Sequence, residues 1–472
     1  MQDSPYDPGP GLPCLLNKMK KALPDPAMTA ITLVFFTTSM DSTIVNAISP
    51  ILARDLQASI TALAWVIDAY LLAFAACIIV AGHLVDRFGA RYLAITGLAI
   101  FTAASALCGL ASGIDTLILF RAIKGVGSAL FFPAALVLIG QAYVNAEQRA
   151  QVIALSAAWA SLGAGLGPLI GILVTSQSSW SGIFILNIPI GLLALSLLHY
   201  SRASEHTVRA CRPAPPQTGH LLLTVAFTGM LAFMLIGLAR PATPRVETLA
   251  AAGALVLLTV LLIRSEARAD TKILPVCLIK SGSFVFSCAI GTLTSFAFYG
   301  LLFIIPVYFF WKTGGSFIGS SLHLLPLSLS PLAGNLLYHM LATRLTLHTA
   351  TVSGLSLAMA GYGTTAVSIH FDLTVGALLA LFVAGTGSAA CSPGIFALLV
   401  RDIHHHRHGI ANALFNACRQ LGALTGVALA AMLFSTLDNE VFAFSLFLTT
   451  STAGIVISLV ALLMIDHRPL PT

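Results

Sequence analysis

The chain has 472 residues, of which 57% are hydrophobic and only 9% are Asp, Glu, Lys or Arg, whereas soluble domains carry about 25% charged residues. This composition excludes an ordinary water-soluble enzyme and an intrinsically disordered chain, and it indicates a polytopic membrane protein. The net charge of +6 does not indicate a nucleic-acid partner, because the basic residues are scattered singly between apolar runs.

Long apolar runs follow one another along the whole chain. A helix that crosses the hydrocarbon core needs about 20 mainly apolar residues, and lipid offers no partner for exposed backbone groups. We therefore expect fourteen membrane-spanning helices, of which the seventh and eighth are the shortest. They lie at about 28–50, 62–82, 92–111, 116–139, 150–175, 182–200, 219–238, 247–263, 283–309, 316–340, 349–369, 373–398, 409–434 and 441–465.

The basic residues predict the orientation of these spans. If the N-terminus is cytoplasmic, 17 Lys and Arg residues fall in cytoplasmic loops and tails and four fall outside. The four outside are Arg54, Arg240, Arg245 and Lys312. Cytoplasmic loops carry an excess of Lys and Arg, so we expect a multi-pass protein of the cell (cytoplasmic) membrane with both termini in the cytoplasm.

Two segments recur at nearly one spacing. GVGSALFFP (125–133) matches GTGSAACSP (385–393) at an offset of 260 residues, and SLGAGLG (161–167) matches QLGALTG (420–426) at 259. An offset of about eight spans predicts two halves that run in the same direction. The expected fold is all-α, with two parallel-repeat six-helix bundles and two extra central helices. The expected segments are a cytoplasmic tail at 1–27, a bundle at 28–200, two additional spans at 201–282, a bundle at 283–465 and a tail at 466–472.

A set of motifs occurs in one order along the first half. The motifs are MDSTIVNAISP (40–50), GHLVDRFGAR (82–91), RAIKGVGSA (121–129) and GAGLGPLIG (163–171). Together they resemble the major facilitator superfamily, and specifically its fourteen-span drug:proton antiporter branch. The resemblance covers about 28–465, and it implies a transporter that works by alternating access between two bundles.

Charged residues inside the predicted spans are the first candidates for function. Only two of the 18 acids, Asp41 and Asp68, lie well inside spans, where a charge costs at least about 2.5–3.5 kcal/mol. Arg121 and Lys124 enter the fourth span to a similar depth, so we expect a buried charge network. Asp41 and Asp68 are candidates for proton coupling, and the resemblance adds Arg121. The alternative for Asp41 is a structural partner of an embedded base.

Four residues are candidates for lining the substrate cavity: Asp41, Lys124, Asn46 and His323. Lys124 stands where the family usually has Gln. It could neutralise one acid, prepare the cavity for an anionic or zwitterionic substrate, or extend its amine outward to the membrane surface. A single embedded His such as His323 is more often a hydrogen-bonded structural group than a proton carrier.

The loop after the second span is a candidate gate. It contains Gly82, Asp86, Arg87, Gly89 and Arg91. The resemblance implies that Asp86 and Arg87 pair with the other half when the cytoplasmic side is closed. The two glycines permit close helix approach and a tight turn, and the alternative is a basic loop that only sets orientation.

The fifth span carries the antiporter-type signature. Gly163, Gly167 and Gly171 form one stripe without side chains, which permits close helix packing, and Pro168 interrupts the backbone hydrogen bonds. The resemblance associates this signature with exporters. Plain helix packing is the alternative, and packing is also the interpretation of Arg419 and Gln420 in the thirteenth span.

These observations predict a transporter and not an enzyme. There is no G-x-x-x-x-G-K-S/T loop for ATP, so we expect a proton gradient as the energy source, with no cofactor and no metal site. The predicted function is proton-coupled antiport that exports a small hydrophobic or amphiphilic molecule, such as a drug or antibiotic. The expected partners are the small molecule, protons and the lipid bilayer, with the protein working as a monomer. The alternative is a symporter or uniporter for a small metabolite.

Overall fold

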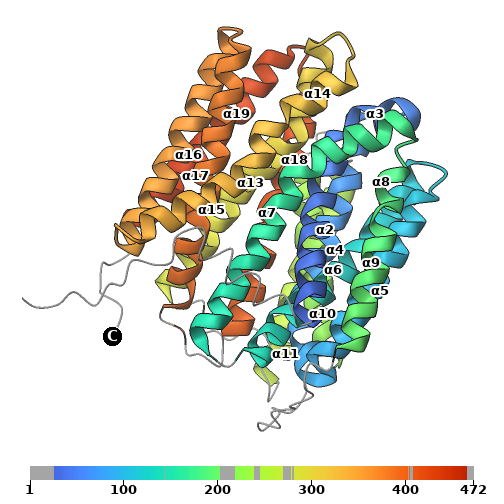
Figure 1. Ribbon diagram of the computed structural model, residues 1–472, viewed down its shortest axis with the longest axis vertical. Helices are drawn as coiled ribbons and strands as arrows, with labels where there is room; N and C mark the ends of the chain where they lie inside the picture. The colour runs from blue at the N-terminus through green and yellow to red at the C-terminus, as the bar shows by residue number, and fades with distance from the viewer. Residues whose placement is uncertain are drawn as a thin grey trace, which may run out of the picture.

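The computed structural model describes residues 26–143, 145–201, 218–238, 245–268, 278, 281–401, 403 and 408–464, and within them every regular element is a helix (Figure 1). The helices are α2 (Pro26–Ala47), α3 (Ser49–Asp55), α4 (Ile60–Phe88), α5 (Ala90–Gly109), α6 (Ile114–Ala142), α7 (Ala146–Gln177), α8 (Gly182–Ile185), α9 (Asn187–Tyr200), α10 (Thr218–Leu238), α11 (Arg245–Arg268), α13 (Gly282–Lys312), α14 (Phe317–His323), α15 (Leu325–Ala342), α16 (Leu347–His370), α17 (Thr374–Val400), α18 (His408–Thr436) and α19 (Glu440–Leu463). The predicted tails, 1–27 and 466–472, lie almost wholly outside the described residues.

The helices follow the apolar pattern of the sequence. Each of the fourteen predicted spans contains a helix or a pair of consecutive helices. Within the described residues, ten helical segments are long and apolar enough to cross a membrane by length and composition. The first, sixth and tenth predicted spans are each divided in two. In the first and tenth, Pro50 and Pro326 stand in the first turn of the second piece. Proline is tolerated there because the first turn needs no backbone N–H partner.

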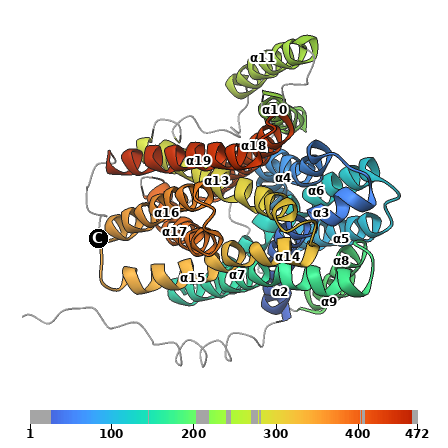
Figure 2. The same ribbon diagram turned by 90° about the horizontal axis from the view of Figure 1, so that it is seen from above.

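The two ends of the chain form corresponding groups of helices. Helix α2 packs on α7 as α13 packs on α18, and α5 packs on α6 as α16 packs on α17. The groups meet where α4 contacts α18 and α7 contacts α15. Seen from above, α3, α5, α6, α8 and α9 lie on one side and α15, α16, α17 and α19 on the other, with α10 and α11 at the edge (Figure 2). The predicted fold of two parallel-repeat bundles with two extra helices is confirmed, whereas the segment boundaries stay predictions.

Glycine contacts repeat between the two groups. A Cβ atom on Gly127 would lie 2.7 Å from the carbonyl oxygen of Gly97. A Cβ atom on Gly387, in the matching motif, would lie 2.6 Å from the carbonyl oxygen of Gly354. Both distances are shorter than real Cβ contacts, so a side chain at either position would push the helices apart. The internal repeat therefore preserves the places where helix backbones touch.

One face of the bundle is closed by contacts between the two groups. This face, here called the α3/α14 face, carries α3 and α14 (top in Figure 1), and the opposite face, called the Gly89 face, carries the α4–α5 turn. Helix α3 contacts α13, and α7 contacts α14. The Ser321 hydroxyl donates to the Ala47 carbonyl oxygen at 2.8 Å, and the Arg54 guanidinium lies 4.6 Å from the Phe317 ring centroid. The two groups are therefore tied together at the α3/α14 face.

Candidate functional site

A buried charge cluster lies in the N-terminal group of helices. Asp41 of α2 accepts from two bases on α6: Arg121 Nη1 lies 2.5 Å from Oδ2, and Lys124 Nζ lies 2.5 Å from Oδ1. All three side chains are at most 2% exposed. The spacing of 121 and 124 places both bases on one side of α6, as i and i+3 positions are. One carboxylate therefore serves two cations, and these three groups carry a net charge of +1.

Neutral groups complete the coordination of this cluster. Asn187 Nδ2 donates to Asp41 Oδ1 at 3.0 Å, and Lys124 Nζ donates to Ser105 Oγ at 3.0 Å. Arg121 Nε donates to the Val66 carbonyl oxygen of α4 at 3.0 Å. Four helices, α2, α4, α5 and α6, and the first residue of α9 thus meet at Asp41. Asn187 belongs to the segment FILNIPIG (184–191) and is not among the predicted members of the charge network.

Aromatic rings cover the two cations. The Arg121 guanidinium lies 4.7 Å from the Tyr70 ring centroid, and Lys124 Nζ lies 4.5 Å from Phe101 and 5.3 Å from Phe184. Such cation–π contacts are strongest where water is excluded. They explain how Lys124, which is 0% exposed, remains inside the bundle. The alternative that its amine extends outward to the membrane surface does not hold in this conformation.

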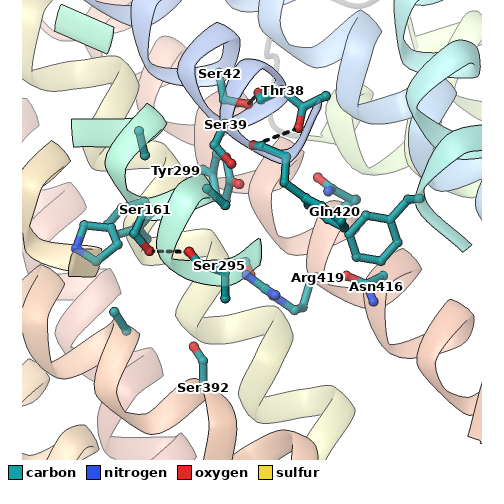
Figure 3. A pocket seen from close by; sticks show the side chains of 18 of the residues that line it. Thr38, Ser39, Ser42, Ser161, Ser295, Tyr299, Ser392, Asn416, Arg419 and Gln420 are labelled. Carbon is teal, nitrogen blue, oxygen red and sulfur yellow. Dashed lines mark hydrogen bonds between the residues drawn. The ribbon is translucent and has the colours of Figure 1, made fainter. Parts of the chain in front are cut away.

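A central cavity of about 470 Å³ lies between the two groups of helices. It is lined by four helices of each group, namely α2, α4, α6 and α7 and their counterparts α13, α15, α17 and α18. Figure 3 shows polar side chains of both groups turned towards it, with Arg419 extending from α18 towards Ser295 of α13. The lining includes Ile139 near the end of α6 and Ile153 near the start of α7, so the cavity extends towards the Gly89 face.

Tyr70 joins the charge cluster to the cavity. Its ring covers Arg121, and its hydroxyl donates to Ser128 Oγ at 2.9 Å. Both Tyr70 and Ser128 line the cavity. If Arg121 moved relative to Asp41, the Tyr70 side chain would therefore transmit that movement to the cavity wall.

The predicted cavity residues lie outside the lining in this conformation. Asp41 and Lys124 are enclosed in the cluster. Asn46 donates to the Ser42 carbonyl oxygen at 2.6 Å within α2. His323 stacks on Phe309 with ring centroids 4.1 Å apart. None of the four lines the central cavity, and their roles in substrate binding stay predictions.

Several cavity residues were not selected from the sequence. Arg419 and Gln420 were interpreted as packing residues, yet both line the cavity. The signal was present, because Arg419 lies about ten residues inside an apolar span, where a charge is costly. The small polar residues gave no such signal, since Ser and Thr are common in membrane helices. Those of α2 that line the cavity are Thr38, Ser39, Ser42 and Thr43.

The structure also places Asp68 and the candidate gate. Asp68 is buried on α4. Asp86 and Arg87 are exposed at the Gly89 face, and neither forms an ion pair with another described residue. Gly89 has a φ of 90°, which favours glycine and turns the chain from α4 into α5. Arg91 donates from Nη2 to the His199 carbonyl oxygen at 2.7 Å.

Gly82 does not make the close helix approach expected of it. No atom of a described residue lies within 4 Å of the position that a Cβ atom would take there. A close approach at Gly82 is incompatible with this conformation and would require the Gly89 face to close.

The glycine stripe of α7 packs within one group. A Cβ atom on Gly163 would lie 2.2 Å from the Phe36 carbonyl oxygen of α2, and one on Gly167 would lie 2.0 Å from Thr43 Oγ1. The stripe therefore holds α7 against the helix that carries Asp41. This interface lies within the N-terminal group and not between the two groups. Gly165 faces the other group instead, where its Cβ atom would lie 2.8 Å from Leu329 of α15.

Metal-binding chemistry is not evident at this site. Among the described residues, no group of three or more His, Cys, Asp or Glu side chains could hold a metal ion. The His-rich run at 404–408 lies outside the described residues except for His408.

Comparison with known proteins places the sequence in one family. The family model described as Major Facilitator Superfamily matches residues 31–427. The methylenomycin A resistance protein of Streptomyces coelicolor is 32% identical over 414 residues, which cover 87% of this chain and 86% of that protein. The tetracenomycin C resistance and export protein of Streptomyces glaucescens is 28% identical over 432 residues, covering 89% and 77%. A D-xylose-proton symporter structure matches with a TM-score of 0.66 at 15% identity, covering 96% of this chain and 98% of that one.

Proposed function

The chain belongs to the major facilitator superfamily, and on that premise we propose that it is a proton-coupled antiporter that exports small hydrophobic or amphiphilic molecules. The observation that carries this proposal is the central cavity, which four helices of each group enclose and which the α3/α14 face closes on one side. Relatives named for resistance to and export of antibiotics support export as the direction. The energy comes from the proton gradient, without a cofactor.

The basic residues support an orientation for this cavity. Because 17 of the Lys and Arg residues fall on the side of the predicted N-terminal tail, we assign the Gly89 face to the cytoplasm and the α3/α14 face to the exterior. The protein then lies in the cell membrane with both termini inside, and it works as a monomer. The described conformation is the one that loads substrate from the cytoplasm or the inner leaflet.

The charge cluster supports a mechanism of coupling. In the described state Asp41 is ionised and holds Arg121 and Lys124. A proton that arrives from outside neutralises Asp41 and removes both ion contacts, so the two bases lose their common partner. Arg121 then shifts against the Tyr70 ring that lines the cavity. Asp68 is the second acid that can exchange a proton in this half.

The loop at the Gly89 face supports a proposal for the step of the transport cycle in which this face closes. Asp86 and Arg87 form no ion pair with a described residue while this face is separated. When the substrate leaves to the exterior, the Gly89 face closes and these side chains meet groups of the C-terminal half. Closure also removes the open space beside Gly82.

The experiment that tests the function is drug susceptibility in a sensitive bacterial host. Expression of the wild-type chain is expected to raise the inhibitory concentration of at least one antibiotic in a broad panel. A protonophore is expected to restore drug accumulation to the level of cells without the protein. Unchanged susceptibility to every compound, with the protein present in the membrane, would contradict export. Continued export after the proton gradient has collapsed would contradict proton coupling.

A further inference from the structure

Among the described residues that line the central cavity, a single side chain is charged. Within this described lining, Arg419 alone carries a formal charge, and no Asp or Glu is present. The other polar members are hydroxyls and amides, such as Ser295, Asn335 and Gln420. A cavity built for a cationic drug would need an acid near the ligand, so this lining does not favour a cation.

Arg419 has no acidic partner within the described part of the chain. Its Nε donates to Ser295 Oγ at 3.3 Å, and its guanidinium lies 5.9 Å from the Phe415 ring centroid. A guanidinium has five N–H donors in a planar fork that fits a carboxylate or a similar oxyanion. Embedded charges are almost always paired. The counter-charge of Arg419 is therefore expected from a bound molecule.

The neighbouring charges do not reverse this preference. Asp41, Arg121 and Lys124 sum to +1 on the other side of Tyr70. If Asp68 is ionised as well, the four groups of the N-terminal half sum to zero. In neither case does that half present a net negative charge to the cavity. Without the positive charge of Lys124, a position where the family usually has Gln, each of these two sums would be one unit more negative.

Four phenylalanines of the N-terminal half contribute to the cavity lining beside hydroxyl side chains. They are Phe35, Phe74, Phe131 and Phe132. They interlock edge to face, with ring centroids of 5.6 Å for Phe35 and Phe132 and 6.1 Å for Phe74 and Phe132. In the C-terminal half, Gln420 beside Arg419 has a buried Oε1 without a hydrogen-bond partner among the described residues. The N-terminal half thus supplies a cluster of four phenylalanine rings beside its hydroxyl groups, and the C-terminal half supplies the one charge found among the described lining residues.

We propose that the transported substrate is an amphiphilic monoanion, whose carboxylate or equivalent oxyanion binds Arg419 and whose apolar body lies against the four phenylalanines. This inference rests on the proposed export function. Gln420 accepts from a hydroxyl or N–H group of the substrate. An interior-negative membrane potential then favours expulsion of the anion and entry of the proton alike.

The test compares three probes that share one ring system. They are 1-naphthalenesulfonate, 1-naphthalenesulfonamide and trimethyl(1-naphthyl)ammonium, whose charges of −1, 0 and +1 do not change near neutral pH. Uptake is measured in everted membrane vesicles with an imposed proton gradient, and uptake by vesicles without the protein is subtracted. We expect the sulfonate to accumulate about tenfold or more above the other two.

Variants of Arg419 assign the preference to this side chain. Arg419→Gln is expected to lower sulfonate uptake by about tenfold to a hundredfold, the range for losing a hydrogen bond to a charged group. Arg419→Lys, which keeps the charge, is expected to restore part of it at equal membrane abundance. Arg344→Gln is the matched control, because it removes an exposed arginine remote from the cavity lining.

A susceptibility panel sorted by antibiotic charge distinguishes failure of the proposed export function from failure of the proposed anionic substrate. Protection chiefly against anionic compounds, lost in Arg419→Gln, would support the inference. Protection against neutral or cationic compounds that survives Arg419→Gln would leave export standing and overturn the anionic substrate. Protection against no compound and uptake of no probe would contradict export itself, and the inference would fall with it.

Discussion

Replacement of Asp41 by Asn tests whether one carboxylate holds two buried cations. At 2.5 Å, each contact of Asp41 with Arg121 or Lys124 is worth roughly 7 kcal/mol at an effective dielectric constant of 20. Desolvation of the three ions opposes most of this energy. Removal of one partner of a buried pair costs about 3–5 kcal/mol in practice, and we expect Asp41→Asn to lower the free energy of unfolding by that amount.

The matched variant is Lys124→Gln in the Asp41→Asn background. The single variant raises the charge of the three groups from +1 to +2, and the double variant returns it to +1. We therefore expect the double variant to be more stable than Asp41→Asn by about 1–3 kcal/mol, as for coupled neighbours in one network. Lys124→Gln alone keeps the Arg121 ion pair and is expected to destabilise less than Asp41→Asn.

Unfolding by SDS in mixed micelles, followed by tryptophan fluorescence, measures these differences on purified protein. The four proteins of the cycle are compared under one set of conditions. Asp41→Asn with wild-type stability would refute the paired carboxylate. A double variant no more stable than Asp41→Asn would show that Lys124 and Arg121 do not depend on the same acid.

Three further predictions concern packing, gating and the surface. Gly163→Ala is expected to abolish folding, measured as membrane abundance, because its Cβ atom would lie 2.2 Å from a backbone oxygen. The control Gly140→Ala, with no described atom near its Cβ position, should accumulate normally. Equal abundance of the two variants would contradict the α2–α7 packing. Gly82→Leu should fold and bind substrate but transport at least about tenfold more slowly, because the side chain obstructs closure of the Gly89 face; wild-type turnover would contradict the gate. Asp372→Asn removes an exposed ion pair with Lys312 and should change the free energy of unfolding by less than about 1 kcal/mol, and a larger loss in the same SDS assay would contradict that estimate.

Much of the fold was predictable because membrane helices need long apolar runs. Backbone groups in lipid must be satisfied within each segment, so the run lengths alone located the helices. The repeat was predictable from glycines, since Gly127 and Gly387 occupy positions where two backbones touch. The helix breaks before α3 and α15 were not predicted. A proline in the first turn of a helix disturbs no backbone hydrogen bond, and the apolar pattern of the sequence continues across it.

The charge cluster was predictable in part, and the cavity was not. A buried network of Asp41, Arg121 and Lys124 was predictable because the three residues lie at a similar depth and few other charges lie inside spans. Depth says nothing about which way a side chain points around its helix axis. The enclosure of Lys124 by Phe101 and the cavity position of Arg419 depend on how neighbouring helices are rotated, which requires the three-dimensional packing.

Proton-driven transport by the Asp41 variants in proteoliposomes tests the central claim most directly. Wild type and Lys124→Gln are expected to accumulate substrate in response to an imposed pH gradient. Asp41→Asn combined with Lys124→Gln restores the charge of the cluster without a titratable acid at position 41. It should still exchange substrate across the membrane without a gradient but should lose accumulation driven by pH. Undiminished pH-driven accumulation in this double variant would contradict coupling through Asp41.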